Sequence, residues 1–228
     1  MRTAVLTPDP TYSSLRTTPA SGDRPCSGAV GTDIAGLERI FDDAIAVAVW
    51  RRSLPAAFDD LLASNLPREE VVLRETLRAA EPDFTSVSRA LGLAVGGAVD
   101  ALLRELIELY AVLADTDSIG LRLAVTRGRP CPRFHVDRVG LRLICTLRGP
   151  GTEWLDGTDV DRRWLGAAGI ADEATGLLRA GAVVHGLGAG DVGIFKGESW
   201  PGNHGRGAVH RSPASDGGWR LLVTLDSL

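Results

Sequence analysis

The chain has 228 residues with 44% hydrophobic and 24% charged side chains, which is the composition of an ordinary globular protein and suits one domain. Its 25 basic and 29 acidic side chains leave a net charge of −4, and because there is no surplus of cations for phosphates or anionic headgroups, nucleic acids and membrane surfaces are disfavoured as partners. The apolar stretch 91–114 contains four charges, the start lacks the apolar core of a signal peptide, and the cysteine count of three argues against a disulfide framework, so we expect a cytoplasmic protein without a membrane span.

Helical patterns dominate the first half of the chain. Residues 1–31 are rich in Pro, Ser, Thr and Gly, which predicts a disordered tail. The next predicted elements are a short helix from Asp33, a strand over 44–50, a helix over 55–62, and a strand or a helix over 70–77. Apolar residues at i, i+4 and i+7 spacing then predict a long amphipathic helix over 95–114, which we expect to cover a sheet.

Strand patterns dominate the second half. Strict alternation predicts strands over 119–125 and 139–147, and shorter strands are predicted over 183–187, over 192–195, around Val209 and over 220–225. Helices followed by many short strands indicate an α+β fold, with an antiparallel sandwich or barrel packed by helices on one side. We therefore predict one domain over 32–228, in which 32–117 is mainly helical support and 118–228 is the barrel core.

The residues with the clearest chemical pattern lie in this second half. His135 and Asp137 are two residues apart, so in an extended segment their side chains point to the same face. A second imidazole, from His210, would complete a set of two histidines and one carboxylate. This arrangement binds Fe(II) on one face and leaves positions open for substrate and dioxygen.

Two further features accompany His210. Arg220 follows it by ten residues and opens an alternating strand, and the segment 188–195 before it contains a Gly-Asp turn that leads into an apolar strand. Together with the H-x-D pattern, these features resemble the iron(II)/2-oxoglutarate-dependent oxygenases, and the resemblance covers residues 132–226.

This resemblance implies an Fe(II)/2-oxoglutarate-dependent dioxygenase acting on an unknown substrate by hydroxylation-type oxidation. In that family a double-stranded β-helix, a cupin-like jelly-roll barrel, holds Fe(II) through the residues that correspond to His135, Asp137 and His210. Arg220 would bind the distal carboxylate of 2-oxoglutarate, because a guanidinium donates two parallel hydrogen bonds. Family members often carry Arg-x-Ser, whereas this chain has Leu222, so the hydroxyl partner of the cosubstrate is missing or comes from elsewhere.

The chain resembles more closely a bacterial family known as domain of unknown function 1826. The matching runs are CPRFHVD from residue 131, RGPGTEWL from residue 148, KGE from residue 196 and HRSP from residue 210. This resemblance covers most of the chain beyond the tail and implies no settled activity. Because members are often encoded near zinc-homeostasis genes, it implies as the alternative a non-catalytic zinc-binding or zinc-homeostasis-linked protein on the same barrel.

The role of Cys131 distinguishes the iron oxygenase from the zinc-binding protein. As a thiolate, Cys131 would join His135, Asp137 and His210 as a fourth ligand and close a zinc site; otherwise it is a small buried thiol. A metal-free cupin-like binding module is a third possibility, and a hydrogen-bonded His–Asp pair in a surface loop is the plain alternative to any metal site. Cys145 falls on the apolar side of its strand and is predicted to lie in the core.

Five other residues are candidates for substrate binding. Arg142 is a second anion anchor if its side of the strand faces the barrel interior, and a solubilising charge otherwise. Trp154 either lines a pocket or packs in the core. Lys196, the only lysine, and Glu198 either bind an anionic substrate group near the barrel mouth or pair with each other. His204 lies in a glycine-rich loop that either closes over a substrate or is a plain solvent loop. Neither the substrate, a small molecule or a protein, nor the oligomeric state follows from the sequence.

Overall fold

The structure, a computed structural model, describes residues 26–166, 171–215 and 217–228, and the strands in these residues form two sheets. The seven-stranded sheet has the order β1-β2-β8-β5-β10-β4-β3, with the strands β1 (Ser27–Gly31), β2 (Ile45–Trp50), β3 (Val71–Arg78), β4 (Ser118–Thr126), β5 (Leu141–Arg148), β8 (Val192–Lys196) and β10 (Arg220–Ser227). The three-stranded sheet has the order β7-β6-β9, with β6 (Glu153–Leu155), β7 (Val184–Gly186) and β9 (Val209–Arg211). Paired strands are antiparallel except β1 and β2, which are parallel.

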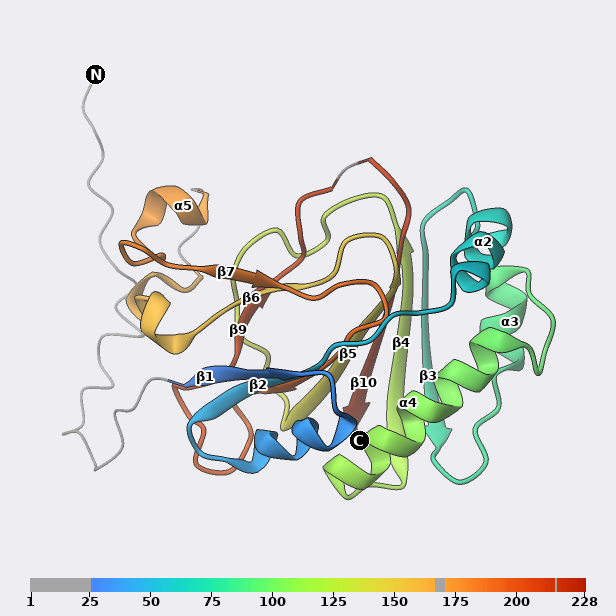
Figure 1. The fold of residues 1–228 in the computed structure, drawn as a ribbon, viewed down its shortest axis with the longest axis horizontal. Coiled ribbons are helices and arrows are strands. Elements are labelled where there is room, and N and C mark those ends of the chain that lie inside the picture. The colour runs from blue at the N-terminus through green and yellow to red at the C-terminus, as the bar shows by residue number, and fades with distance from the viewer. Residues whose placement is uncertain (1–25, 167–170, 216) are drawn as a thin grey trace.

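Helices cover one face of the large sheet. The helical elements are η1 (Ile34–Phe41), α2 (Ala56–Asn65), α3 (Thr85–Leu91), α4 (Ala98–Ala114), η2 (Gly157–Asp159), η3 (Arg162–Trp164) and α5 (Asp172–Thr175). Figure 1 shows α2, α3 and α4 on one side of the large sheet and the small sheet on its other side. The fold is therefore α+β, as predicted.

The longest helix, α4, carries the predicted apolar stripe. Leu103, Leu106 and Ile107 are fully buried in the main core, which the helices form with the large sheet. The Tyr110 hydroxyl donates to the Leu141 carbonyl at 2.8 Å and so ties the helix to β5. This helix therefore covers one face of the large sheet and shields it from solvent.

Strand β10 divides its side chains between two environments. Leu221, Val223 and Leu225 belong to the helix-covered core. Because successive residues of a strand point to opposite faces, Arg220 and Leu222 point toward the small sheet. This second face, which we call the inner face of the large sheet, carries the polar residues that concern function.

A second apolar cluster joins the two sheets. Trp154 packs with Ile144, Phe195 and Leu222 of the large sheet. A Cβ atom at Gly28 would lie 2.0 Å from the Trp154 ring, so only glycine permits this approach of β1 to the indole. In the part of the chain that the structure describes, no hydrogen-bonded ladder joins the two sheets, which face each other rather than closing into one.

Most of the predicted elements are confirmed. Predicted helices 55–62 and 95–114 correspond to α2 and α4, predicted strand 44–50 to β2, and the strands predicted in the second half to β4, β5, β7, β8, β9 and β10. The segment 70–77, for which the sequence allowed a strand or a helix, forms the strand β3. Cys145 is fully buried, as predicted.

The prediction of a tail up to residue 31 is wrong at its end. Residues 27–31 form β1, which pairs in parallel with β2, and the predicted tail over 1–25 lies outside the described residues. The region 32–117 supplies two strands, β2 and β3, in addition to its helices. Among the described residues, no helix has the length and apolar character needed to cross a membrane.

Candidate metal centre

Two distant segments of the chain meet at a pair of histidines. His135 lies in the loop between β4 and β5, and His210 is the central residue of β9. The backbone N–H of each residue donates to the carbonyl of the other at 3.0 Å, which forms an isolated antiparallel bridge. Residues paired in this way point to the same side, and the two ring centroids are 4.5 Å apart. The predicted second imidazole is thus brought beside the first.

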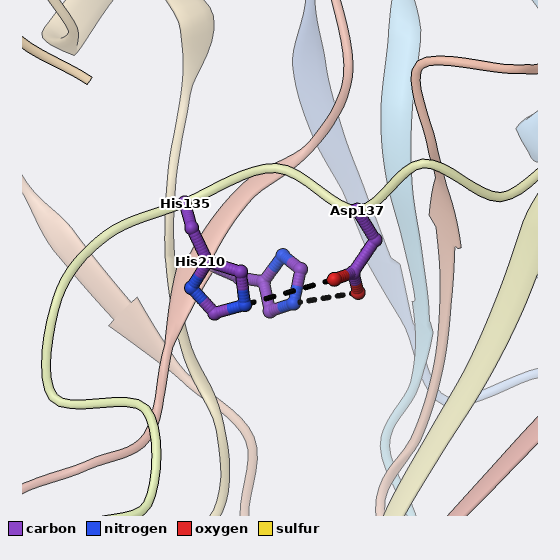
Figure 2. A group of neighbouring side chains, drawn as sticks. All are labelled: His135, Asp137 and His210. Atoms are coloured by element: carbon purple, nitrogen blue, oxygen red, sulfur yellow. Dashed lines mark ion pairs between the residues drawn. The ribbon is translucent and has the colours of Figure 1, made fainter. Parts of the chain in front are cut away.

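Asp137 completes the group (Figure 2). Its carboxylate oxygens lie 3.2 Å from Nε2 of His210 and 3.7 Å from Nε2 of His135. One ligand atom from each of the three residues lies within 4.8 Å of the other two. The H-x-D spacing and the distant histidine therefore converge on one point, as the sequence predicts.

The other ring nitrogens determine the tautomer of both imidazoles. Nδ1 of His135 lies 2.9 Å from the Arg133 carbonyl, and Nδ1 of His210 lies 3.0 Å from the Ala208 carbonyl. Because a carbonyl only accepts, each neutral ring has its proton on Nδ1 and its lone pair on Nε2, facing the Asp137 carboxylate. Burial lowers the pKa of His135, which favours this neutral form. Three electron pairs then face one another, an arrangement that a metal cation between them stabilises.

Arg142 holds the carboxylate of Asp137 in place. Its Nη1 donates to Oδ2 of Asp137 at 2.5 Å, and its Nε and Nη2 each donate to Asp226 at 2.7 Å. Burial by itself would raise the pKa of Asp137, but its contact with His210 and the charge of Arg142 outweigh this effect, so this pKa lies well below its usual range. Asp137 is therefore ionised, which is the form that binds a metal.

The loop that carries His135 is anchored by a buried carboxylate. Asp172 of α5 accepts the backbone N–H of Phe134 at 2.7 Å. Arg211 of β9 lies over the Phe134 ring at 4.1 Å, and its Nη1 is 3.7 Å from Asp172. One network therefore orients both of the segments that supply histidines.

Arg220 is a buried cation without a carboxylate partner among the described residues. Its Nε donates to the Pro150 carbonyl at 2.8 Å, and its Nη2 lies 3.3 Å from Oγ1 of Thr146 and 3.1 Å from Oγ1 of Thr152. Its Nη1 is buried and has no hydrogen-bond partner in the described part of the chain. Burial, and then repulsion by Arg122, lowers the pKa of this guanidinium to about 10. An unused donor on a buried cation is costly, and a bound anion would satisfy it.

Two threonine hydroxyls lie beside the Arg220 guanidinium. Thr146 comes from β5 and Thr152 from the segment before β6, and both side chains are buried beside the guanidinium. Arg220 also lines a cavity together with Pro150 and residues 212–215. The cation and the two hydroxyls together suit a ligand that carries a carboxylate.

Two predicted roles change in the structure. Arg142 lies on the inner face, but its guanidinium is already paired with Asp137 and Asp226, so it is not an anion anchor. Cys131 is exposed and is not part of the group formed by the two histidines and Asp137. The structure therefore does not form the closed zinc site in which this thiolate is a fourth ligand.

Trp154 packs in the core rather than lining a pocket. The side chain is 1% exposed and belongs to the cluster between the sheets. Residue 154 pairs with His210 across β6 and β9, and its ring stacks on His185 with the centroids 4.2 Å apart. The indole therefore supports the strand that carries the second histidine.

Lys196 is not brought to the metal centre. In the β5–β8 pairing it lies opposite Leu141, a residue of the helix-covered core, so its side chain leaves the sheet on the face away from the histidines. The Lys196 side chain is 2% exposed, and its ammonium donates to the Asp42 carbonyl at 2.8 Å. This lysine ties η1 to the sheet.

Glu198 and His204 belong to the glycine-rich loop. The Glu198 carboxylate accepts the backbone N–H groups of Gly205 at 2.7 Å and Gly207 at 3.0 Å. The side chain of His204 is 81% exposed and lies 3.7 Å from the same carboxylate. Glu198 therefore pairs with the loop and not with Lys196, while its backbone N–H donates to the Asp137 carbonyl at 2.8 Å.

Several residues of the site were not singled out from the sequence. Extending the alternation of 220–225 by one residue would have placed Asp226 on the same face as Arg220. The alternation over 139–147 places Thr146 on the same strand face as Arg142, but it assigns no role to the hydroxyl. Asp172 and Thr152 lie in irregular segments with no periodic pattern, so no local feature indicates what they contact.

Comparison with known proteins gives a family and a fold. A family model described as a protein of unknown function, DUF1826, matches residues 31–226, and no curated protein sequence matches the chain. Among solved structures, the chain is similar to dioxygenase for auxin oxidation 1 from Arabidopsis thaliana in its complex with 2-oxoglutarate, with 11% identity, a TM-score of 0.52 and coverage of 89% of this chain and 92% of that chain. It is also similar to a prolyl-4-hydroxylase from Pseudomonas putida, with 13% identity, a TM-score of 0.48 and coverage of 85% and 97%. The first of these similarities shows a shared fold.

Proposed function

The chain belongs to the DUF1826 family, and we propose that it is an iron(II)- and 2-oxoglutarate-dependent oxygenase that oxidises its substrate by hydroxylation-type chemistry. On this proposal the two facing sheets are the two halves of a double-stranded β-helix, with the metal held between them. The observation that carries the proposal is the presence of His135, Asp137 and His210 in one domain with Arg220, a buried guanidinium whose Nη1 has no partner.

The three ligands have separate tasks in binding the metal. His135 and His210 supply Nε2 lone pairs, and Asp137 supplies a negative charge that Arg142 and Asp226 keep in place. The three ligand groups occupy one face of the ion. The iron held by these residues would supply the activation of dioxygen.

Arg220 would orient the cosubstrate. Its unused Nη1 and its shared Nη2 present two donors to the distal carboxylate of 2-oxoglutarate, and the hydroxyls of Thr146 and Thr152 lie within reach of the same group. Burial of this cation excludes water, so a carboxylate there meets little competition. The similar Arabidopsis structure, a complex with 2-oxoglutarate, supports the choice of this dicarboxylate.

The proposal is tested by anaerobic addition of Fe(II) and 2-oxoglutarate to the purified protein. Chelation of the cosubstrate by the iron produces a weak visible charge-transfer band, which we expect for the wild-type chain. The band should disappear in His210→Ala, which lacks a ligand, and in Arg220→Met, which lacks the cation. Arg89→Met is the matched control, because Arg89 is an exposed residue of α3 and its replacement should leave the band unchanged.

Absence of the band in the wild-type protein would refute the oxygenase. If zinc then bound tightly, the chain would instead be a zinc-binding protein that uses the same three ligands. This alternative has less support because Cys131, its proposed fourth ligand, lies outside the group.

A further inference from the structure

A second arginine faces the same side of the large sheet as Arg220. Arg122 of β4 lies opposite Thr224 of β10 on one side and opposite Arg74 of β3 on the other. Residues paired across antiparallel strands point to the same face, and Thr224 and Arg220 share the inner face because they are four residues apart on one strand. Arg122 and Arg74 therefore extend the inner face toward the β3 edge.

Neither of these two arginines has a hydrogen bond or an ion pair with any residue that the structure describes. Directly opposed like charges destabilise a pair of strands. Nearby carboxylates do not compensate, since Asp226 is engaged by Arg142, and Glu70 accepts from Thr126 and from backbone N–H groups. The sheet thus carries two adjacent cations that form no ion pair with any described carboxylate.

The position of Arg122 is central to the proposed site. Along the inner face of β10, its partner Thr224 lies between Arg220 and Asp226, so Arg122 lies between the cosubstrate anchor and the Asp226–Arg142 pair. The charges of Arg142 and Asp137 both act on its guanidinium, and its own charge acts on Arg220. Burial, and then repulsion by Arg74, lowers the pKa of Arg122.

This edge of the inner face is open. Val72, in the next row of the sheet toward Arg220, is 51% exposed, and Arg74 is also exposed. Arg122 itself is half-buried. A molecule can therefore reach Arg122 from solvent without displacing either sheet.

The charges of the proposed site balance without these two residues. The cations are the metal and the guanidiniums of Arg142 and Arg220. The matching anions are Asp137, Asp226 and the two carboxylates of 2-oxoglutarate. Arg122 and Arg74 remain as a surplus of positive charge beside a complete centre, which is the electrostatic condition for binding an anionic molecule.

We propose that Arg122, assisted by Arg74, binds an anionic group, a carboxylate or a phosphate, of the molecule that is oxidised at the metal centre. The proposal rests on the proposed oxygenase function and deepens it by assigning an acidic substrate class. The half-buried Arg122 is the principal contact because its guanidinium is the less hydrated of the two. Arg74, which is exposed, strengthens the positive field.

The test is a calorimetric titration of the protein with two probes, monomethyl phosphate and acetate. The protein is loaded with Zn(II), freed of excess metal and saturated with 2-oxoglutarate, so that Arg220 is already occupied. We expect at least one probe to bind. Arg122→Gln should weaken that binding about tenfold, Arg74→Gln should weaken it less, and the exposed Arg89→Gln, which changes the net charge equally, should not weaken it. The stronger probe indicates whether the substrate anion is a phosphate or a carboxylate.

Two kinds of result, absent or unaltered anion binding and an equal effect on 2-oxoglutarate, would overturn the inference while leaving the oxygenase intact. One is that 2-oxoglutarate binds and neither anion does, or that Arg122→Gln leaves anion binding unchanged. The other is that Arg122→Gln weakens 2-oxoglutarate as strongly as the probe, which would place Arg122 in the cosubstrate site. Failure of 2-oxoglutarate to bind the metal-loaded wild type is a separate outcome, which refutes the proposed function and the substrate role with it.

Discussion

The two faces of β10 both bury their side chains, but those side chains are apolar on one face and include a cation on the other. On the helix side, Leu221, Val223 and Leu225 are fully buried among apolar neighbours. On the inner side, Arg220 is equally buried but has an unused donor. The helix side therefore contributes to stability by removing apolar surface from water, whereas the inner side retains a cost that a ligand would remove.

The helix side should respond to truncation with the greatest loss of stability. Leu225→Ala removes a fully buried side chain and leaves a cavity, so we expect the free energy of unfolding to fall by about 3 kcal/mol. Urea unfolding measures this loss. Below the unfolding transition, zinc affinity should stay that of the wild type, because Leu225 faces away from the ligands.

Val112→Ala is the control for this substitution. Val112 lies on α4 and is 80% exposed, so its truncation should change stability by less than about 0.5 kcal/mol. A similar loss in both variants would contradict the assignment of β10 to two different environments.

A paired and an unpaired arginine should differ in the same measurement. Arg211 is buried and pairs with Glu153 and Glu173, both at 2.7 Å, so Arg211→Met removes the partner of Glu173, leaves Glu153 only the more distant Arg129, and should cost about 2 kcal/mol. Arg220→Met removes a cation that has no counterion, and the metal-free protein should lose no more than about 1 kcal/mol. Equal losses would show that Arg220 has a partner that the structure does not describe.

Weakening the contacts that orient Asp137 should lower the affinity of the protein for zinc. Asp226→Asn weakens the bidentate pair that holds Arg142, so Asp137 becomes less well oriented and zinc affinity should fall about tenfold. Competition with a chelating indicator measures the change. Asp60→Asn, at an exposed position of α2, removes the same charge and should leave the affinity unchanged. An unaltered affinity in Asp226→Asn would mean that Arg142 alone orients the ligand.

The exposed thiol should have the smallest effect. Because Cys131 lies outside the group of three ligands, Cys131→Ser should bind zinc as tightly as the wild type in the same competition assay. A loss comparable to that of His210→Ala would instead place the thiolate on the metal and favour the zinc-binding protein.

Local patterns in the sequence predicted much of the difference between the two faces of β10. The alternation in 220–225 assigned Arg220 and the leucines to their faces, and the apolar stripe in 95–114 placed the covering helix. The same reasoning missed β1, because this short, glycine-containing strand is stabilised by pairing with β2 and by contact with Trp154, which are both distant in the chain. The periodicity of apolar residues predicts a helix or a strand, but it does not predict which other strand that element pairs with.

In the candidate site, too, the sequence predicted some features and the tertiary structure decided others. Residue types and spacing were sufficient to select His135, Asp137, His210 and Arg220, because metal ligation and carboxylate binding each require particular functional groups. Residue type alone could not separate Arg142, which is neutralised by two carboxylates, from Arg122, which has none. That distinction depends on which strands pair and in which register, since a side chain's charge acts through the neighbours that folding places around it.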